Sequence, residues 1–269
     1  MFGLKRAFRQ VSGQVSGKDD SSVAEQMAAA YDAASRNDYA AALEIWGPLA
    51  HAGIARAQNN IGACFAEGLG VERDAKMAAR WLSLSAEACD PVGLRNYAAL
   101  YFKGEGVDQD YARAAGLYRA AAEKGDAPAQ DMLSWMLLEG DVIAPDIAGA
   151  KRWALAAAEQ NIPAAMTRLG MIYHDAIGVE RDPVQAASWW RRAAERGDAD
   201  GQAMLGAALH LGAGVPRERP AALAWLLRAQ RGGSALAAPF LSPARALLSP
   251  AEIAEAERLA AAPLAEAAS

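Results

Sequence analysis

The chain has 269 residues, of which 53% are hydrophobic and only 7% aromatic, and its formal net charge is −5 at pH 7. This acidic balance argues against a surface whose main role is to bind nucleic-acid phosphates. Two cysteines are too few for a disulfide framework, and no run reaches the roughly 18 apolar residues of an integral membrane segment. We expect no secretory signal and a cytoplasmic location.

The start of the chain is basic and rich in small polar residues. Residues 1–22 are expected to form a flexible basic tail and linker. Phe2, Leu4 and Phe8 are interspersed with basic residues there, so the tail could also bind a membrane surface or a partner. The Gly- and Ser-rich composition favours a disordered leader.

A first pair of helices is predicted next, over residues 23–35 and 39–51. Residues 36–38, Arg-Asn-Asp, are typical of a turn between them. This segment, 23–54, lacks the loop motif that marks the rest of the chain. We interpret it as a degenerate N-terminal helical hairpin, because terminal units of repeat arrays are atypical.

From residue 55 the chain repeats itself every 36 residues. The marker is a Gly-x-Gly-Val loop or a degenerate copy of it, and the step from Val71 to Val107 is maintained through all copies. A fixed period of this length is the signature of stacked helical hairpins. The central part therefore divides into five repeats: 55–90, 91–126, 127–162, 163–198 and 199–234.

Each repeat is predicted to hold a first helix over positions 1–13, a loop over positions 14–19 and a second helix over positions 21–34. Positions 7, 8 and 11 place a large, a small and a large residue on one stripe of the first helix. The second helix should cross closely at the small residue. Position 8 is Gly62, Ala98, Ser134, Gly170 and Gly206.

The loop glycines permit the left-handed backbone that ends the first helix. Val142 and Ala176 replace two of these glycines, and Glu218 stands where an aspartate would cap the second helix. In the other repeats Asp74, Asp110, Asp146 and Asp182 are suited to be N-caps. Position 27 predicts a buried ladder of large side chains between helices: Trp81, Leu117, Trp153, Trp189 and Trp225.

The loop motif ends at residue 234, and residues 235–269 are expected to be C-terminal capping helices followed by a frayed tail. Ser249 and Glu252 form a capping box, with Pro250 at the first helical position, which opens a last helix to about residue 262. Residues 235–248 are interpreted as the irregular partner of this helix. The prediction amounts to about fourteen helices.

The recurring pattern Leu-Gly-x-x-Tyr-x-x-Gly-x-Gly-Val-x-x-Asp, followed by Ala-x-x-Trp-x-x-x-Ala-Ala-x-x-Gly-Asp, resembles the Sel-one-like repeat (SLR) family, a relative of the tetratricopeptide repeats. Residues 163–198 match it best. The resemblance implies an all-α fold, a right-handed α-α superhelix or solenoid of stacked antiparallel helix pairs with 36-residue repeats. It also implies an adaptor that assembles protein complexes.

The candidate catalytic and metal-binding residues are few. The Gly-x-Gly loops lack the strand–loop–helix context of phosphate loops, so they do not indicate a phosphate site. The histidines do not indicate a metal site. His174 and His210 share position 12, but no third metal ligand is evident. Cys64 and Cys89 are predicted to lie on the order of 13 Å apart, beyond disulfide reach, and neither has a base nearby in sequence. We expect no catalytic residue, no metal and no cofactor.

The remaining candidate site is a partner-binding groove. First helices line the concave wall in this repeat class, and positions 5, 6, 9, 12 and 13 avoid the core stripe. Aromatic and aliphatic anchors rimmed by Asn and Arg suit a peptide. Any one residue could instead tile a solvated or inter-repeat surface. The predicted groove residues are Asn59, Asn60, Arg95, Asn96, Phe102, Lys103, Trp135, Leu138, Arg168, Met171, His174 and His210.

The sequence thus favours a non-catalytic scaffold or adaptor that binds a protein or peptide, acts as a monomer, and contacts neither nucleic acid nor the membrane interior. Arginines such as Arg119, Arg191, Arg192 and Arg228 lie on second helices and are interpreted as a solvated face. One alternative is a hydrolase or a binder of β-lactam or cell-wall ligands, but the chain lacks the paired cysteines of such relatives. A second alternative is an adaptor held at a membrane surface by the basic tail.

Overall fold

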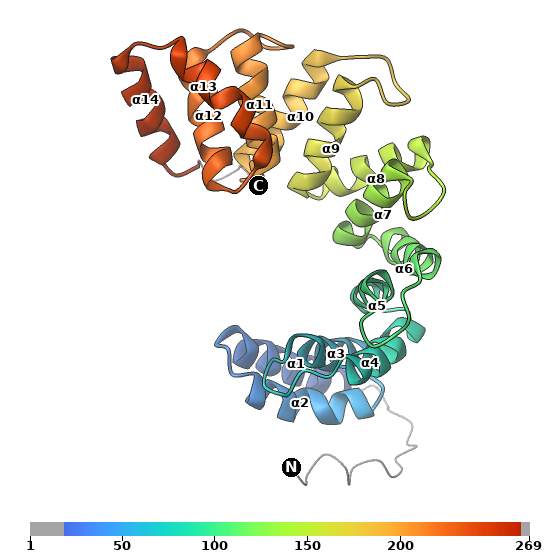
Figure 1. Ribbon diagram of the computed structural model, residues 1–269. Helices are drawn as coiled ribbons and strands as arrows, with labels where there is room; N and C mark the ends of the chain where they lie inside the picture. Colours follow the sequence, from blue (N-terminus) through green and yellow to red (C-terminus); the bar gives the residue numbers. More distant parts are fainter. Residues whose placement is uncertain (1–18, 265–269) are drawn as a thin grey trace. The chain divides into compact units, whose positions relative to one another are not determined.

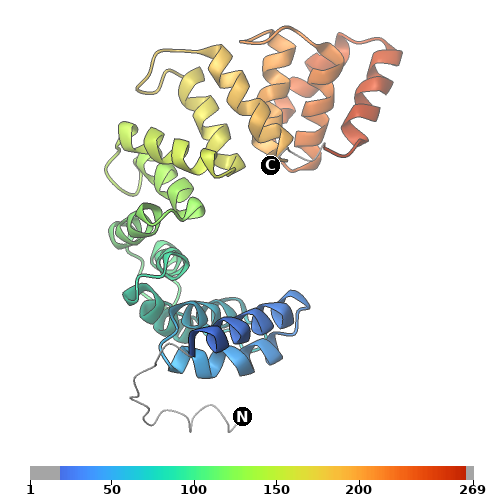
Figure 2. The ribbon, with the colours of Figure 1, turned by 180° about the vertical axis from the view of Figure 1, so that it is seen from behind.

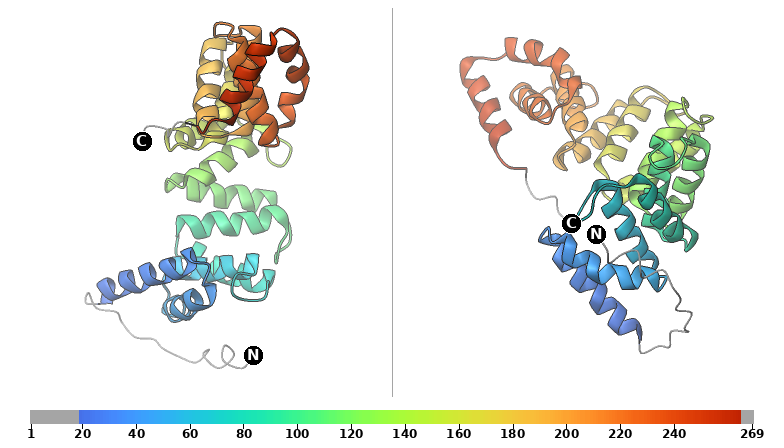
Figure 3. Two further views of the ribbon diagram at one scale, coloured as in Figure 1. Left: turned by 90° about the vertical axis from the view of Figure 1, so that its left-hand side faces the viewer. Right: turned by 60° about the horizontal axis from the view of Figure 1, so that its bottom comes forward.

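The computed structural model describes residues 19–264 of the chain (Figure 1). Within that range all regular elements are helices, and they form stacked antiparallel pairs that confirm the all-α solenoid fold. The pairs are seen from other sides in Figures 2 and 3. The described residues cluster into two compact units, the first ending at Asp126 and the second starting at Ala127. Each unit is described by itself.

The first unit holds six helices in three pairs within its described residues. The first helix begins at Asp19, four residues before the predicted start. The predicted tail and its Phe2, Leu4 and Phe8 otherwise lie outside the described residues. The helices are α1 (Asp19–Ser35), α2 (Tyr39–His51), α3 (Ala55–Glu67), α4 (Ala75–Glu87), α5 (Pro91–Lys103) and α6 (Tyr111–Glu123).

The second unit continues the pairs and ends in a cap. The capping box is confirmed, because Ser249 N donates to Glu252 Oε2 over 2.8 Å and Glu252 N donates to Ser249 Oγ. Residues 235–246 are helical rather than irregular, since Pro239 falls in the first turn of a helix, where its missing N–H is not needed. The elements are α7 (Ala127–Glu139), α8 (Ile147–Glu159), α9 (Pro163–His174), α10 (Pro183–Glu195), α11 (Ala199–Leu211), α12 (Arg219–Arg231), the 3₁₀ turn η2 (Ala235–Ala237), α13 (Ala238–Ala246) and α14 (Pro250–Ala261).

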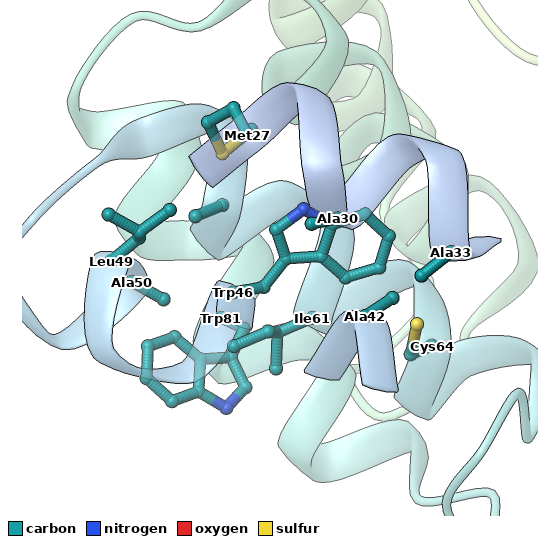
Figure 4. Close-up of a cluster of buried hydrophobic side chains, with 11 residues drawn as sticks. Met27, Ala30, Ala33, Ala42, Trp46, Leu49, Ala50, Ile61, Cys64 and Trp81 are labelled. Carbon is teal, nitrogen blue, oxygen red and sulfur yellow. The ribbon is translucent and has the colours of Figure 1, made fainter. Parts of the chain in front are cut away.

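The N-terminal hairpin closes one end of the hydrophobic core of the first unit (Figure 4). Trp46 of α2 is only 4% exposed and lies between Met27 and Ala30 of α1 and Ile61 of α3. Trp81 of α4 joins the same cluster. The hairpin therefore covers the apolar side of the first full repeat, as a terminal unit of a solenoid must.

The predicted close crossing at position 8 is confirmed in the three repeats that carry glycine there. A Cβ added to Gly62 would lie 2.7 Å from Leu82 Cγ, and one added to Gly206 would lie 2.8 Å from Leu226 Cγ. In the fourth repeat the partner of Gly170 is the indole of Trp190, whose Nε1 would be 2.2 Å from the added carbon. Position 8 of the first helix thus meets position 28 of the second.

The predicted ladder at position 27 is correct in where the rings pack and wrong in how deeply they are buried. Trp81 meets His51 of α2 edge-on, with ring centroids 5.2 Å apart, and Trp189 packs against a cluster of buried residues from α8, α9 and α10. Only Trp81 is buried, whereas Trp153, Trp189 and Trp225 are half-buried. The fully enclosed large side chains stand at position 28 instead: Leu82, Tyr118, Trp190 and Leu226.

The second helices begin as predicted. Asp74 accepts hydrogen bonds from the backbone N–H groups of the first turn, as do Asp110, Asp146 and Asp182 in their repeats. Glu218 makes no side-chain cap hydrogen bond to α12. This difference follows from the side chain, because glutamate is one methylene longer than the residues that cap best.

The loops show what replacing a glycine does. The glycines at position 14 have φ between 70° and 75°, and Ala176 at the same position has φ 58°. Alanine is thus forced into left-handed backbone, which is costly for a residue with a Cβ. Val142 at position 16 is not among the described residues with positive φ, unlike Gly70, Gly106 and Gly178. The third loop therefore follows a different backbone path, as a β-branched residue requires.

Candidate functional site

The first helices form one side of each unit. In neighbouring repeats α3 contacts α5, α7 contacts α9, and α9 contacts α11, while the corresponding second helices within each unit make fewer contacts with one another. First helices that approach one another more closely than the second helices do must line the inner side of the stack. This inner side carries the positions that the sequence predicts for partner binding.

In the first unit the inner side is crossed by a chain of amides. Asn96 Nδ2 donates to Asn59 Oδ1 over 2.8 Å, and Asn59 Nδ2 donates to Asn60 Oδ1 over 3.1 Å. Asn59 is only 4% exposed. Its amide therefore joins α3 to α5 in the protein interior.

Arg95 is also engaged within the first unit. Its Nη1 lies 3.1 Å from Oδ1 and 2.9 Å from Oδ2 of Asp126. Arg56 makes a similar contact one repeat earlier, with Nη2 2.8 Å from Asp90 Oδ2. Both aspartates occupy position 36, so the last residue of a repeat holds an arginine from its own first helix. The Arg95 guanidinium is consequently engaged in an ion pair within its own repeat, which gives it a structural role.

Phe102 and Lys103 lie at the end of α5. The Phe102 ring is half-buried and meets the Tyr111 ring edge-on, with centroids 5.2 Å apart. Gln109 Nε2 donates to the Phe102 carbonyl over 2.9 Å. The Phe102 ring and carbonyl thus contact residues at the end of the loop of their own repeat. Lys103, the last residue of the helix, is exposed.

In the second unit Arg168 is paired with Asp131 of the preceding first helix. Their side chains are 12% and 21% exposed. The pair joins position 5 of one repeat to position 6 of the next, the same register as Asn59 and Asn96. Position 5 can also bond within its repeat, because Thr167 Oγ1 donates to Asp198 Oδ2 over 2.6 Å. Asp131 was not predicted as a site residue, and its signal is the spacing of 37 residues to Arg168.

The remaining predicted residues of the second unit leave apolar surface on its inner side. Met171 is 39% exposed, and Trp135 and Leu138 are half-buried. His174 Nδ1 lies 2.7 Å from Asp175 Oδ1, and its ring is 5.4 Å from that of Trp190. His210 is half-buried on α11. The exposed thioether of Met171, on the same helix as His174, offers an adaptable apolar contact.

The cysteines are both free, as predicted. Cys64 is buried, and burial raises the pKa of its thiol to about 11, which leaves almost no thiolate at neutral pH. Cys89 is exposed and follows α4. In residues 19–264 no three His, Cys, Asp or Glu side chains are grouped closely enough to hold a metal ion. Along the same stretch no helix has the length and apolarity to cross a bilayer.

Comparison with known proteins identifies the repeats. A family model described as the Sel1 repeat matches residues 55–88, 91–126, 127–162, 163–198 and 199–234. The crystal structure of a Sel1 repeat protein from Oxalobacter formigenes is 26% identical, with a TM-score of 0.76 over 90% of this chain and 99% of that one. A Pseudomonas aeruginosa protein, 16% identical over 85% and 90% of the chains with a TM-score of 0.50, shares the fold. None of the curated proteins matches.

Proposed function

The chain belongs to the Sel1 repeat family, and on that premise we propose that it is a non-catalytic scaffold that binds a peptide or partner protein on the inner sides formed by its first helices. Sel1 repeat proteins are generally protein-interaction scaffolds and mostly not enzymes. We further propose that the protein acts as a cytoplasmic monomer. The partner is a protein or peptide and not a nucleic acid.

One observation carries the proposal, the apolar surface around Met171. Met171 is 39% exposed and lies one helical turn after Arg168, whose side chain pairs with Asp131 of the neighbouring first helix α7. Half-buried Trp135 and Leu138 on α7 and the imidazoles of His174 and His210 extend this surface. Aromatic and Met side chains are enriched in the buried centres of protein interfaces. We propose these five residues as the principal contacts.

The polar pairs support the proposal by holding this surface in shape. The ion pair of Asp131 and Arg168 fixes α7 against α9, and the amides of Asn59 and Asn96 do the same for α3 and α5. A preorganised surface loses less entropy when it binds. In the first unit we keep Asn60, Phe102 and Lys103 as contacts. Arg95, Asn96 and Arg168 are assigned to support instead.

The proposal is tested with peptides selected against the full chain from a random library. A Met171→Glu variant should weaken the selected peptides by about tenfold or more, because an apolar contact of roughly 1.4 kcal/mol or more is replaced by a charge. Leu84→Glu is the matched control, since Leu84 is 43% exposed but lies on a second helix. Fluorescence polarisation gives both dissociation constants. Unchanged affinity in Met171→Glu would exclude the inner side of the second unit.

A further inference from the structure

Five cations without carboxylate partners lie on the second helices α8 and α10 and on the C-cap residue of α10. We call Lys151, Arg152, Arg191, Arg192 and Arg196 the basic face. In the described part of the chain none of them forms an ion pair. By contrast Arg56, Arg95 and Arg168 are all paired. The only acidic residues of the two helices stand at their last positions, 159 and 195, so this face is positive in a chain of net charge −5.

Aromatic rings hold three of the five cations of the basic face in place. The Arg192 guanidinium carbon lies 4.3 Å from the centre of the Trp189 ring, and the Arg152 carbon 4.9 Å from that of Trp153. Lys151 Nζ lies 5.0 Å from the Tyr173 ring. A stacked guanidinium keeps the N–H groups at its edge available to acceptors while it loses little further freedom on binding. These arginines are therefore preorganised donors.

The two helices present the cations as one surface. Trp189 of α10 packs against the cluster of buried residues to which α8 contributes, which includes Ala154 and Ala158. Arg196 Nε, beyond the end of α10, donates to Asn161 Oδ1, beyond the end of α8, over 3.2 Å. These contacts connect α10 with the elements packed on α8 in the middle of α10 and with the residues beyond the end of α8.

The fifth repeat shows which chemical group can bind to an arginine stacked on a tryptophan. Arg228 stacks on Trp225 at 5.5 Å, at the same repeat positions as Arg192 and Trp189. Its Nη2 donates to the carbonyls of Leu259, over 2.7 Å, and Ala262. These carbonyls belong to the C-terminal end of α14, which carries partial negative charge. In the fifth repeat the stack thus has an electron-rich occupant from the chain itself.

We propose that the basic face of α8 and α10 binds an acidic segment of a partner protein. The carboxylate and carbonyl oxygens of that segment take, at Trp189 and Arg192, the place that the end of α14 takes at Trp225 and Arg228. Carboxylates match guanidinium donors in geometry and charge. This site is separate from the inner sides of the units, so its existence does not depend on the function proposed above.

A protein segment fits better than a nucleic acid or a membrane. The basic face has five cations in an acidic chain, and a phosphate polymer needs a larger positive footprint. Insertion into a bilayer needs aromatic rings that project beyond the cations. Here Trp153 and Trp189 are half-buried, with guanidinium groups stacked on their rings.

The experiment uses the full chain and a fluorescein-labelled twelve-residue peptide of alternating glutamate and alanine, read by fluorescence anisotropy at low salt. The double variant Arg191→Gln/Arg192→Gln should weaken binding about tenfold, the loss expected from two surface charge contacts. The matched control is Arg119→Gln/Lys124→Gln, which removes two exposed cations from α6 and its C-cap. It should change the affinity less than twofold. Added salt should weaken binding to the unaltered chain.

Each other outcome decides the proposal. Equal weakening in the two double variants would show that net charge alone drives binding and would overturn the assignment to this face. Tighter binding of a twelve-nucleotide single strand or of anionic phospholipid vesicles, lost in the Arg191/Arg192 variant, would replace the acidic peptide as the occupant. Circular dichroism checks that the helices persist. If the double variant loses helicity, Arg191→Gln alone, which changes an exposed side chain, replaces it in the same anisotropy assay, and an unchanged affinity would then overturn the proposal.

Discussion

Gly170 tests the packing rule of the repeats directly. In the fourth repeat the largest side chain of the protein's position-28 series, Trp190, lies against the smallest residue available at position 8. A Cβ on residue 170 would lie 2.2 Å from Nε1 and 2.3 Å from Cδ1 of the indole. Trp190 is 2% exposed, so its ring has no empty space into which to move. Gly170→Ala should therefore force the two helices apart.

The magnitude follows from three contributions. Alanine gains about 1 kcal/mol over glycine inside a helix. Overpacking a tight core costs about 1–3 kcal/mol. A further cost of about 1 kcal/mol follows if Trp190 Nε1 loses its 3.3 Å hydrogen bond to the Thr167 carbonyl. We expect Gly170→Ala to lower the free energy of unfolding by about 1–3 kcal/mol.

The control is the same substitution at Gly116. This glycine lies in the middle of α6, and an added Cβ would meet no atom within 4 Å. Gly116→Ala should stabilise the chain by about 0.5–1 kcal/mol. Urea titrations followed by far-UV circular dichroism give both changes, and the two midpoints should move in opposite directions. A shared direction would refute the inference that position 8 is the point of closest helix approach.

Three further predictions follow from backbone strain, burial and the C-terminal cap. Ala176→Gly should stabilise the chain by about 1 kcal/mol in the same titration, because φ at residue 176 is 58°; a loss of stability would contradict the strain. Under native conditions dithiobis(nitrobenzoate) should modify one thiol per chain, the exposed Cys89, and reach Cys64 only after unfolding; two fast thiols would show that Cys64 is accessible. Arg231→Ala, which removes the 3.0 Å bond from Nη1 to the Ala260 carbonyl, should speed hydrogen exchange in α14 and leave α3 unchanged, and unaltered exchange in α14 would show that this arginine does not hold it.

The helical pairs could be predicted from sequence because their causes are local. The 36-residue period gives the spacing of the pairs. The glycines that end first helices and the aspartates that begin second helices each act within a few residues of themselves. The degree to which a given tryptophan is buried could not be predicted in this way. Trp189 and Trp190 are adjacent and equally large, and periodicity cannot say which one faces Gly170. That is decided by the crossing of two helices, which places the indole of Trp190 against the glycine.

The candidate site was harder to predict because its polar residues are shared between repeats. Asn59 and Arg168 lie outside the core stripe of their own helix, so the pattern of one repeat marks them as available donors. Their partners come from other elements, such as Asn96 for Asn59 and Asp131 for Arg168. The Trp–Arg stacks were missed for a related reason, since an arginine three residues after a tryptophan in α10 becomes informative only once the ring is known to be half-buried.

The two kinds of contact described here have different ranges along the chain. The size match of Gly170 and Trp190 is complete inside one repeat, whereas the hydrogen bond from Asn96 to Asn59 and the ion pair of Asp131 and Arg168 each span two repeats. A repeat that is duplicated, deleted or exchanged during evolution would carry its own steric fit with it. It would leave behind mismatched charges and amides at both new junctions. A few hydrophilic side chains therefore determine which repeats can follow one another, and these are the ones to redesign first when repeats are recombined.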